Sequence, residues 1–330
     1  MRRRDMFRLL ACGGAVGASA LRAQQQMAAG TMWRSGDIVP EPKRSGKPRA
    51  GQVLAAIQPH SDDISLFAAG TVAKLIEEGC TGYQIRTTND EKAGPGTMGE
   101  TVLSNEKDTD AVARALGLTK TYHLNYRNHR LDDASRQDLR GRLIFLFRLL
   151  KVDIVVSYDP WGLYEENPDH YVTAQAVEAA CWMAAGGKDY PEHFDAGLKP
   201  HGVSEKYYFA RGPQLVNRVV DISSTIDRKI DANLANLSQG PAGSSGSRLR
   251  AELAAKGKRL PLLGSDDREA NRQYIQHIVL DEDSEALRGV ASDKATGRAY
   301  GFEWAEPFHW IGPHASRLDG YISEHAQPLR

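Results

Sequence analysis

The chain has 330 residues, of which 41% are apolar and 25% charged, so a packed globular core is expected rather than a disordered chain. Lysine plus arginine and aspartate plus glutamate each number 42, and this balance gives no indication of a nucleic-acid partner. The three cysteines show no CxxC spacing, which argues against a cysteine-based zinc site or a disulfide framework.

The first residues predict an export signal. Three arginines at 2–4 precede an apolar stretch from Leu9 to Leu21, and small residues before the glutamines at 24–26 offer a cleavage site. Paired arginines ahead of such a stretch favour the twin-arginine route, which exports folded proteins. We therefore predict a signal peptide over residues 1–23 and a periplasmic or secreted protein. No later stretch is apolar enough to span a membrane.

Residues 24–50 are rich in glycine, proline and basic side chains and are expected to form a linker or an arm on the surface. Residues 51–330 are expected to form a single catalytic domain with a variable segment near 240–300. In that domain Cys80 and Cys181 are expected to be two buried thiols, although a disulfide between them stays open. The sequence is compatible with a homo-oligomer.

From Gly51 onward, strand and helix patterns alternate. Short apolar runs predict strands over 53–57, 83–88, 122–126 and 153–157, while helical spacing predicts helices over 66–76, 100–116, about 139–150 and 172–184. Residues 89–99, with three glycines and a proline, form a loop. Repeated units of this length favour an α/β fold, with a Rossmann-like, mostly parallel sheet and helices on both faces.

The second half of the chain is less regular. We expect a strand over 216–222, a helix over 224–237 and a flexible connection over the glycine- and serine-rich residues 239–247. The charged stretch 248–298 has no clear pattern.

A histidine and two acids follow the first expected strand, in the segment Pro59-His60-Ser61-Asp62-Asp63. Parallel sheets bind ligands beyond the carboxyl ends of their strands, which is where this segment lies. One imidazole and one carboxylate three residues apart suit zinc. The same residues also suit a helix start, with Ser61 as N-cap, and for this cluster alone the helix start is the better explanation.

A second cluster, Asn167-Pro168-Asp169-His170, follows the fourth expected strand after a loop. His170 would complete a site of two histidines and one carboxylate with an open position for water. A helix cap at Asp169 is again the alternative. Because two such clusters each follow a buried strand, the metal site becomes the favoured interpretation.

The two clusters resemble the motifs of the LmbE-like, or PIG-L, N-acetylglucosaminyl deacetylases. His60-Ser61-Asp62-Asp63 is similar to that family's His-Pro-Asp-Asp, and the segment 167–170 to its His-Pro-Asp-His. The resemblance extends from about Gln52 to Ala184 and continues weakly through 220–222, 238–239 and 305–308. It implies the family's fold, a zinc cofactor and a small-molecule N-acetylated sugar or glycoconjugate as substrate.

By this resemblance the zinc ligands are His60, Asp63 and His170, and Asp62 is the general base. Zinc lowers the pKa of bound water to about 7, so a neighbouring carboxylate can take its proton at neutral pH. Asp62 would later return a proton to the departing amine. Asp169 would orient a ligand from behind.

Asn167 departs from the family pattern, because it replaces a histidine thought to assist the oxyanion or the leaving group. Asparagine donates a hydrogen bond but cannot carry a proton, so the catalytic role expected of Asn167 is support of the oxyanion. Asn128 and His129 occupy the place of the family's usual Asp-Gly. His129 either substitutes for the missing histidine or is an exposed loop residue, and the latter is favoured.

The sequence thus predicts a zinc-dependent hydrolase that removes an acetyl group from an N-acetylated sugar or a related amide. Two alternatives stay open. One is a metal-dependent phosphoesterase with the same ligands, which would need a clustered basic phosphate site. The other is a non-catalytic carbohydrate-binding module, a reading that the replacement at Asn167 keeps open. Trp161, Tyr164, Trp304 and Trp310 are candidate sugar-stacking faces, although aromatic residues more often pack in cores.

Overall fold

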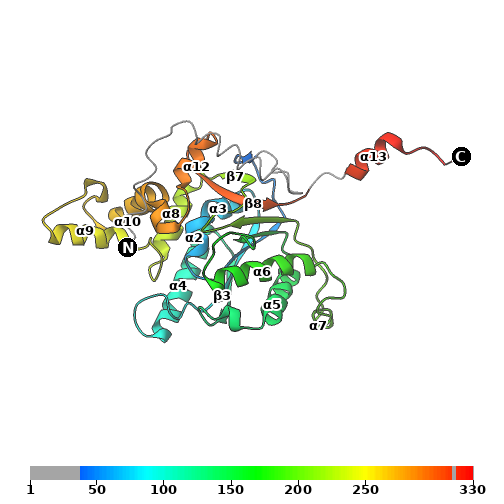
Figure 1. Cartoon of the computed structure of the whole chain (residues 1–330), viewed down its shortest axis with the longest axis horizontal. Helices are drawn as coiled ribbons and strands as arrows, with labels where there is room; N and C mark the ends of the chain where they lie inside the picture. Colours follow the sequence, from blue (N-terminus) through cyan, green and yellow to red (C-terminus); the bar gives the residue numbers. More distant parts are fainter. Residues whose placement is uncertain (1–37, 314–316, 330) are drawn as a thin grey trace, which may run out of the picture. The chain divides into compact units, whose positions relative to one another are not determined.

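The structure is a computed structural model that describes residues 38–313 and 317–329 (Figure 1). The predicted signal peptide over 1–23, and residues 24–37 of the predicted arm, lie outside the described residues. The described residues from Pro40 onward belong to one unit of the chain. Within the described part of the chain, no helix has both the length and the apolar character needed to cross a membrane.

In the described chain, eight strands form one sheet in the order β1-β7-β8-β6-β5-β2-β3-β4. Strand β2 pairs in parallel with β3 and β5, β3 pairs in parallel with β4, and β5 with β6, whereas β8 is antiparallel to both β6 and β7. The sheet is therefore mostly parallel, as the sequence predicts. The strands are β1 (Val39–Glu41), β2 (Val53–Gln58), β3 (Thr81–Thr88), β4 (Lys120–Tyr126), β5 (Ile154–Tyr158), β6 (Glu205–Phe209), β7 (Arg218–Asp221) and β8 (Ala305–Ile311).

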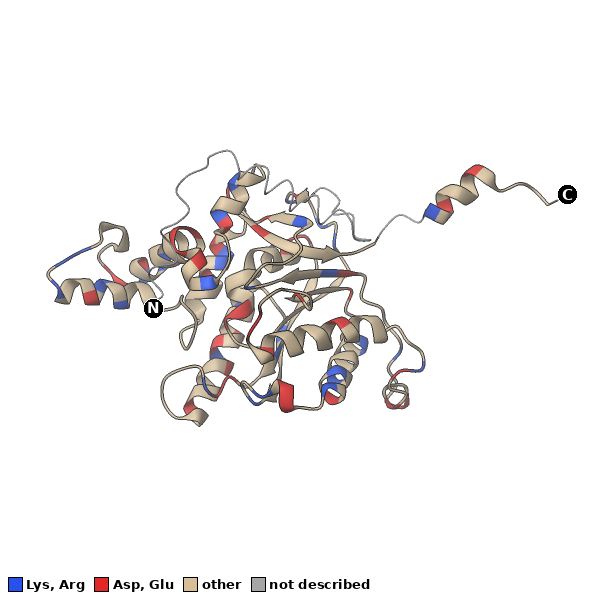
Figure 2. Ribbon diagram, in the orientation of Figure 1, with Lys and Arg blue, Asp and Glu red and all other residues tan. Residues whose placement is uncertain are grey.

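Helices cover both faces of this sheet. The α-helices are α2 (Asp63–Phe67), α3 (Ala69–Glu77), α4 (Met98–Leu116), α5 (Arg136–Leu150), α6 (Pro168–Met183), α7 (Glu192–Asp195), α8 (Ile226–Ala235), α9 (Ser245–Ala255), α10 (Asp267–Tyr274), α11 (Ser284–Arg288), α12 (Asp293–Ala299) and α13 (Arg317–His325). Short turns of other helix types are η2 (Leu131–Asp133), η3 (Pro261–Leu263) and η4 (Ile275–Glu282). Figure 2 shows acidic and basic residues interspersed along the ribbon, in keeping with the balanced composition.

Side chains of β2 alternate between two hydrophobic cores. Leu54 and Ala56 pack with side chains of α2, α3, α4 and α8, whereas Ala55 and Ile57 pack with side chains of α5 and α6 (Figure 1). Successive residues of a strand point to opposite faces of the sheet. Because both faces of β2 are buried, its sequence is a continuous apolar run rather than an alternating one.

The predicted helix over 66–76 begins earlier and is broken. Helix α2 ends at Phe67 and α3 begins at Ala69, with Ala68 at φ −140° between them. The break frees the carbonyl of Leu66 from the helical ladder, and the buried guanidinium of Arg288 donates a hydrogen bond of 2.7 Å to it. The partner lies more than 200 residues away in the sequence, so local spacing could not show the break.

Four further segments differ from the sequence-based expectation. Strands β6 and β8 were not expected, because β6 is short and Pro307 in β8 is unusual in a strand with neighbours on both sides. The predicted surface arm over residues 24–50 contains strand β1, and its Glu41 and Arg49 are buried and form ion pairs with Lys74 and Glu205. The predicted flexible connection over 239–247 is ordered against the core, and α9 already begins within it.

Candidate active site

The predicted site residues meet where strand order reverses. The chain runs from β2 outward through β3 and β4 and then returns to place β5 on the other side of β2. Such a switch point is where open α/β sheets bind ligands. His60, Asp62, Asp63, Asn167 and His170 all line one cavity of about 440 Å³ at the carboxyl ends of β2 and β5.

The segment after β2 forms a tight turn that leads into α2. The Asp63 carboxylate folds back to accept a hydrogen bond of 2.8 Å from the backbone N–H of His60. The backbone N–H of Ser61 donates to the buried Asp90 at 2.9 Å, and the Ser61 hydroxyl donates to Asn105 at 3.0 Å. The turn is therefore fixed from both sides. Ser61 supports it through these bonds and is not the N-cap, a position that Asp62 occupies.

His170 reaches the same point from the first turn of α6. Its Nε2 lies 3.0 Å from Nδ1 of His60. Oδ1 of Asp63 lies 3.6 Å from this Nε2, and Oδ2 of Asp63 lies 3.6 Å from Nδ1 of His60. All three side chains are buried. The ring of His170 also stacks on Tyr158 with centroids 4.2 Å apart, which holds its plane.

These separations suit one metal ion. Four donors arranged tetrahedrally about 2.1 Å from zinc lie roughly 3.4 Å from one another. The two ring nitrogens lie 3.0 Å apart, and each lies 3.6 Å from a different oxygen of Asp63. One donor atom from each of the three residues can be chosen so that all lie within 4.8 Å of one another, which is close enough to share one ion. Their role as metal ligands stays a prediction, whereas their convergence is a feature of the structure.

Two of the three candidate ligands are held from behind by buried groups that do not face the metal position. The Asp169 carboxylate lies 3.1 Å from Nε2 of His60 and also accepts hydrogen bonds from the backbone N–H groups of His129 and Leu131. The hydroxyl of Tyr158 donates to Asp63 at 2.7 Å. Partners of this kind fix the orientation and tautomer of metal ligands. The placement of Asp169 fits the orienting role suggested by the sequence.

The electrostatic potential of the cluster favours a cation. Burial disfavours a charged imidazole, yet the carboxylates of Asp169 and Asp63 raise the pKa of His60 well above its ordinary value. Burial and the nearby Asp63 raise the pKa of Asp62 to about 7, whereas His170, His60 and Tyr158 overcome burial and lower the pKa of Asp63 to about 2. Two neighbouring acids thus differ in basicity, as expected for one ligand and one proton acceptor.

A distant segment completes the surroundings of Asp62. Gly240 lies at φ +82°, and a Cβ at this position would be 2.8 Å from the Asp62 carboxylate. Next to it, the Gln239 amide donates to the Ser61 hydroxyl at 2.7 Å. The expected flexible connection is therefore a wall of the site at residues 239–241, and only glycine permits its close approach.

Asn167 performs the capping role that the alternative interpretation gave to Asp169. Its side-chain oxygen accepts a hydrogen bond of 3.0 Å from the backbone N–H of Asp169, at the start of α6. The Asn167 side chain also lines the cavity, and its NH₂ group has no hydrogen-bond partner among the described residues. One end of the amide thus holds the helix and the other remains available as a donor.

The remaining candidates are unequal. His129 is exposed, lies at φ 56° and lines the cavity, and with His60 and Asp169 it forms a second group whose ligand atoms all lie within 4.8 Å of one another. Tyr164 is exposed at the cavity and Trp161 is exposed in the same loop, but Trp304 is buried in the core and is no stacking face. Trp310 is half-buried under the Arg218 guanidinium. Cys80 and Cys181 are buried and are not bonded to each other.

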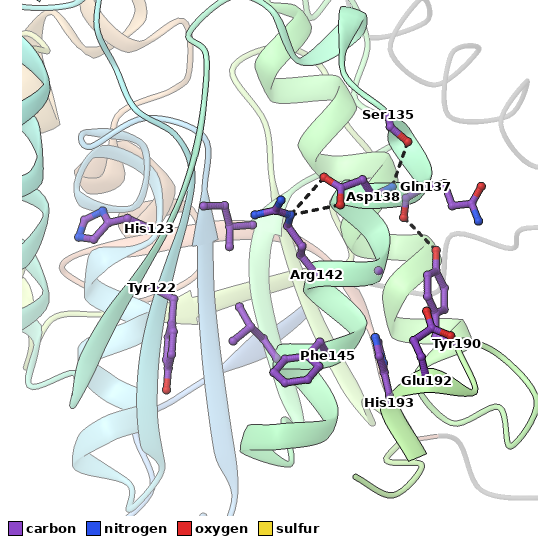
Figure 3. A pocket seen from close by; sticks show the side chains of 13 residues that line it. Tyr122, His123, Ser135, Gln137, Asp138, Arg142, Phe145, Tyr190, Glu192 and His193 are labelled. Carbon is purple, nitrogen blue, oxygen red and sulfur yellow. Dashed lines mark hydrogen bonds and ion pairs between the residues drawn. The ribbon is translucent and has the colours of Figure 1, made fainter. Parts of the chain in front are cut away.

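A larger cavity, of about 620 Å³, lies elsewhere, between β4, α5 and α7 (Figure 3). The Asp138 carboxylate accepts a hydrogen bond of 3.1 Å from the guanidinium of Arg142. The hydroxyl of Tyr190 donates a hydrogen bond to a backbone carbonyl. Asp138 and Tyr190 thus have partners within the fold, whereas Nδ1 of His123, which also lines this cavity, has no hydrogen-bond partner in the described chain. We place the chemistry at the smaller cavity, because two histidines and two acids of the sequence motifs converge there.

Sequence reasoning missed three residues at the site. Tyr158 is the last residue of β5, Glu165 lies in the loop before Asn167, and Arg211 follows β6 and lines the cavity. The position of Tyr158 at a carboxyl strand end was a usable signal. Arg211 could not be placed without β6, which has no strong pattern.

Comparisons with known proteins agree with this geometry. Residues 55–181 match the PIG-L family model, described as GlcNAc-PI de-N-acetylase. The diacetylchitobiose deacetylase of Thermococcus kodakarensis is 28% identical over 197 residues, which are 57% of this chain and 70% of that protein.

Solved structures show the same fold. The N,N'-diacetylchitobiose deacetylase of Pyrococcus horikoshii has a TM-score of 0.60 at 20% identity, covering 95% of this chain and 96% of that one. A hydratase from Pseudomonas putida has a TM-score of 0.54 at 16% identity, covering 81% and 98%. Because this fold also occurs in a hydratase, fold alone does not decide the reaction. The segment that matches the PIG-L family model includes both motifs.

Proposed function

We infer that this protein is a zinc-dependent hydrolase that removes an acetyl group from an N-acetylated sugar or a related amide. The observation that supports this most is the convergence of His60, Asp63 and His170 next to a separate acid, Asp62, in one cavity. The match to a de-N-acetylase family model and the similarity to a diacetylchitobiose deacetylase support the reaction class.

The donor set fits zinc better than harder cations, because it pairs two imidazoles with a single carboxylate. Zinc bound there would polarise the amide carbonyl and make a water molecule acidic enough to lose its proton near neutral pH. His60, Asp63 and His170 would hold the ion.

Asp62 and Asn167 have different roles in the proposed reaction. Asp62, with its raised pKa, takes a proton from the attacking water and returns it to the amine as the C–N bond breaks. The free NH₂ group of Asn167 donates to the carbonyl oxygen as negative charge develops there. Asparagine cannot supply a proton, so Asp62 serves both proton transfers.

A phosphoesterase is disfavoured by the charges around the cavity. Among the described residues, its two lining arginines are already engaged: Arg211 pairs with Glu165 and Glu166, and Arg288 pairs with Asp293 and donates to two backbone carbonyls. No unpaired lysine or arginine therefore lines the cavity in the described part of the chain, where a phosphate would need one. A carbohydrate-binding module would show sugar binding without turnover.

The test is release of acetate and free amine from N-acetylglucosamine and N,N'-diacetylchitobiose by the purified protein with added zinc. A deacetylase releases both products in equal amounts, and activity disappears with a chelator and returns with zinc. Sugar binding without acetate release would favour the binding module. Hydrolysis of a phosphate ester instead would favour the phosphoesterase.

We further propose that residues 1–23 direct export by the twin-arginine route. The paired Arg3 and Arg4 before an apolar stretch support this. In the double variant Arg3→Lys/Arg4→Lys the protein should stay in the cytoplasm. Normal yield of the mature protein outside the cytoplasm would contradict the twin-arginine route and leave another export route in its place.

A further inference from the structure

The candidate ligand His170 has a second ring nitrogen that faces away from the metal position. Its Nδ1 lies 3.1 Å from the Glu165 carboxylate, and both atoms are buried. Neither atom has a hydrogen-bond partner within the described chain, so the contact between them is a close ion pair rather than a formed hydrogen bond. Within the described chain, Glu165 is the acid that lies within pairing distance of this nitrogen.

Glu165 is itself fixed by two further contacts. Its other carboxylate oxygen accepts from the backbone N–H of Asn167 and from the guanidinium of Arg211, both at 3.0 Å. A fixed carboxylate thus stands behind His170, as Asp169 stands behind His60.

The loop that holds Glu165 is attached to the neighbouring strand. The backbone N–H of Asp159 donates to Phe209 at 2.7 Å, and that of Leu163 donates to Pro213 at 2.8 Å. These two hydrogen bonds lie on either side of the Arg211–Glu165 ion pair, so the segment after β6 and the loop after β5 are joined at three points. A loop held in this way can fix the orientation of a buried ring.

We propose that Glu165, held in place by Arg211, is a positioning residue that sets the tautomer of His170 for metal binding. A carboxylate that accepts from Nδ1–H leaves the Nε2 lone pair free to face the ion and raises its basicity. This inference rests on the proposed metal site. It assigns Glu165 no contact with the substrate.

The neighbouring acid provides a matched control. Glu166 also accepts a hydrogen bond from Arg211, at 2.6 Å, but makes no contact with His170 and is mostly exposed. Removing either acid takes one charge from Arg211. Only the removal of Glu165 takes the acceptor from His170.

The experiment measures the zinc dissociation constant of metal-stripped protein by competition with a chromophoric chelator. Glu165→Ala should weaken zinc binding about 10–100-fold, the usual effect of losing such a partner. Glu165→Gln, which keeps an acceptor without the charge, should fall between it and wild type. Glu166→Ala should bind zinc as wild type does.

A spectroscopic readout separates positioning from a general loss of structure. With Co²⁺ in place of zinc, Glu165→Ala should change the visible absorption bands, which report the ligand geometry, while the melting temperature of the metal-free protein stays near that of Glu166→Ala. Equal zinc affinity in Glu165→Ala and wild type, or equal loss in both alanine variants, would overturn the proposal. If wild type binds zinc but releases no acetate, the proposed reaction fails and the positioning role stands. If wild type binds no zinc, both fail.

Discussion

The two ends of the parallel strands bury charged side chains in opposite ways. At the amino ends, three acids face three bases: Glu41 and Glu78 pair with Lys74, Arg49 pairs with Glu205, and Arg218 pairs with Glu41. At the carboxyl ends, Asp62, Asp63 and Asp169 have no lysine or arginine within pairing distance among the described residues.

Burying ionised groups without partners costs several kcal/mol per ion, so a charge imbalance inside a protein calls for an explanation. The paired acids and bases at the amino ends have a structural role, because their ion pairs connect β1, α3 and β6. The imbalanced cluster fits the proposed metal ion, which His60, Asp63 and His170 would hold, and the proposed general base Asp62. Charge balance therefore separates structural ionic networks from functional ones in this molecule.

The largest effect is expected from neutralising the acid that is not a ligand. Asp62→Asn keeps the size of the side chain and removes its basicity, so acetate release should fall on the order of 10²–10⁴-fold. Zinc content and melting temperature should persist, because Asp62 neither binds the ion nor pairs with a cation. Wild-type turnover in this variant would remove the general-base assignment, and unchanged sugar affinity without any wild-type turnover would indicate a binding module.

Breaking the balanced end should affect stability instead. Lys74→Met leaves Glu41 and Glu78 buried without their shared cation, and the free energy of unfolding should fall by about 3–5 kcal/mol. Activity per folded molecule should not change. Lys43→Met is the control, since its exposed pair with Glu77 is worth about 0–1 kcal/mol. Urea unfolding measures both, and equal losses would contradict the contrast in burial.

At the site, Asn167→Asp separates the two ends of one side chain. Aspartate caps a helix as well as asparagine does, so the melting temperature should stay close to wild type. The donor toward the carbonyl oxygen is lost, and kcat should fall about 10²–10³-fold. If kcat holds while KM rises, Asn167 contacts the substrate without supporting the oxyanion.

The smallest effect is expected on the stability of the protein at low pH. Burial would raise the pKa of Glu41, but Lys74 and Arg218 outweigh it and the pKa is lowered. The ionised group therefore contributes stability above the ordinary glutamate pKa of about 4.5, which is lost as pH falls through the lowered value. In Glu41→Gln, the free energy of unfolding should decline less steeply over that window. If the pH dependence of the free energy of unfolding is the same in Glu41→Gln and wild type, Glu41 does not contribute to the loss of stability in acid.

Sequence patterns located the chemistry because it depends on local features. Strands β2 and β5 are apolar runs, and the polar motifs directly after them lie at carboxyl strand ends by construction of a parallel sheet. Contacts from distant segments could not be read in the same way. Gly240 approaches Asp62 from a stretch that looks like a flexible connection, and Arg211 follows a strand too short to recognise. The sequence places Glu165 only five residues before His170, but it does not show that the two side chains meet. That contact depends on how the loop after β5 leads into α6.

The metal content of purified variants tests the central claim most directly. Wild type should hold about one zinc ion per chain, and His60→Ala, Asp63→Ala and His170→Ala should hold none, since a catalytic zinc site needs three protein ligands. His129→Ala should keep its zinc, because His129 belongs only to the second candidate group. Full zinc in His170→Ala, or loss of zinc in His129→Ala alone, would contradict the site described for this protein.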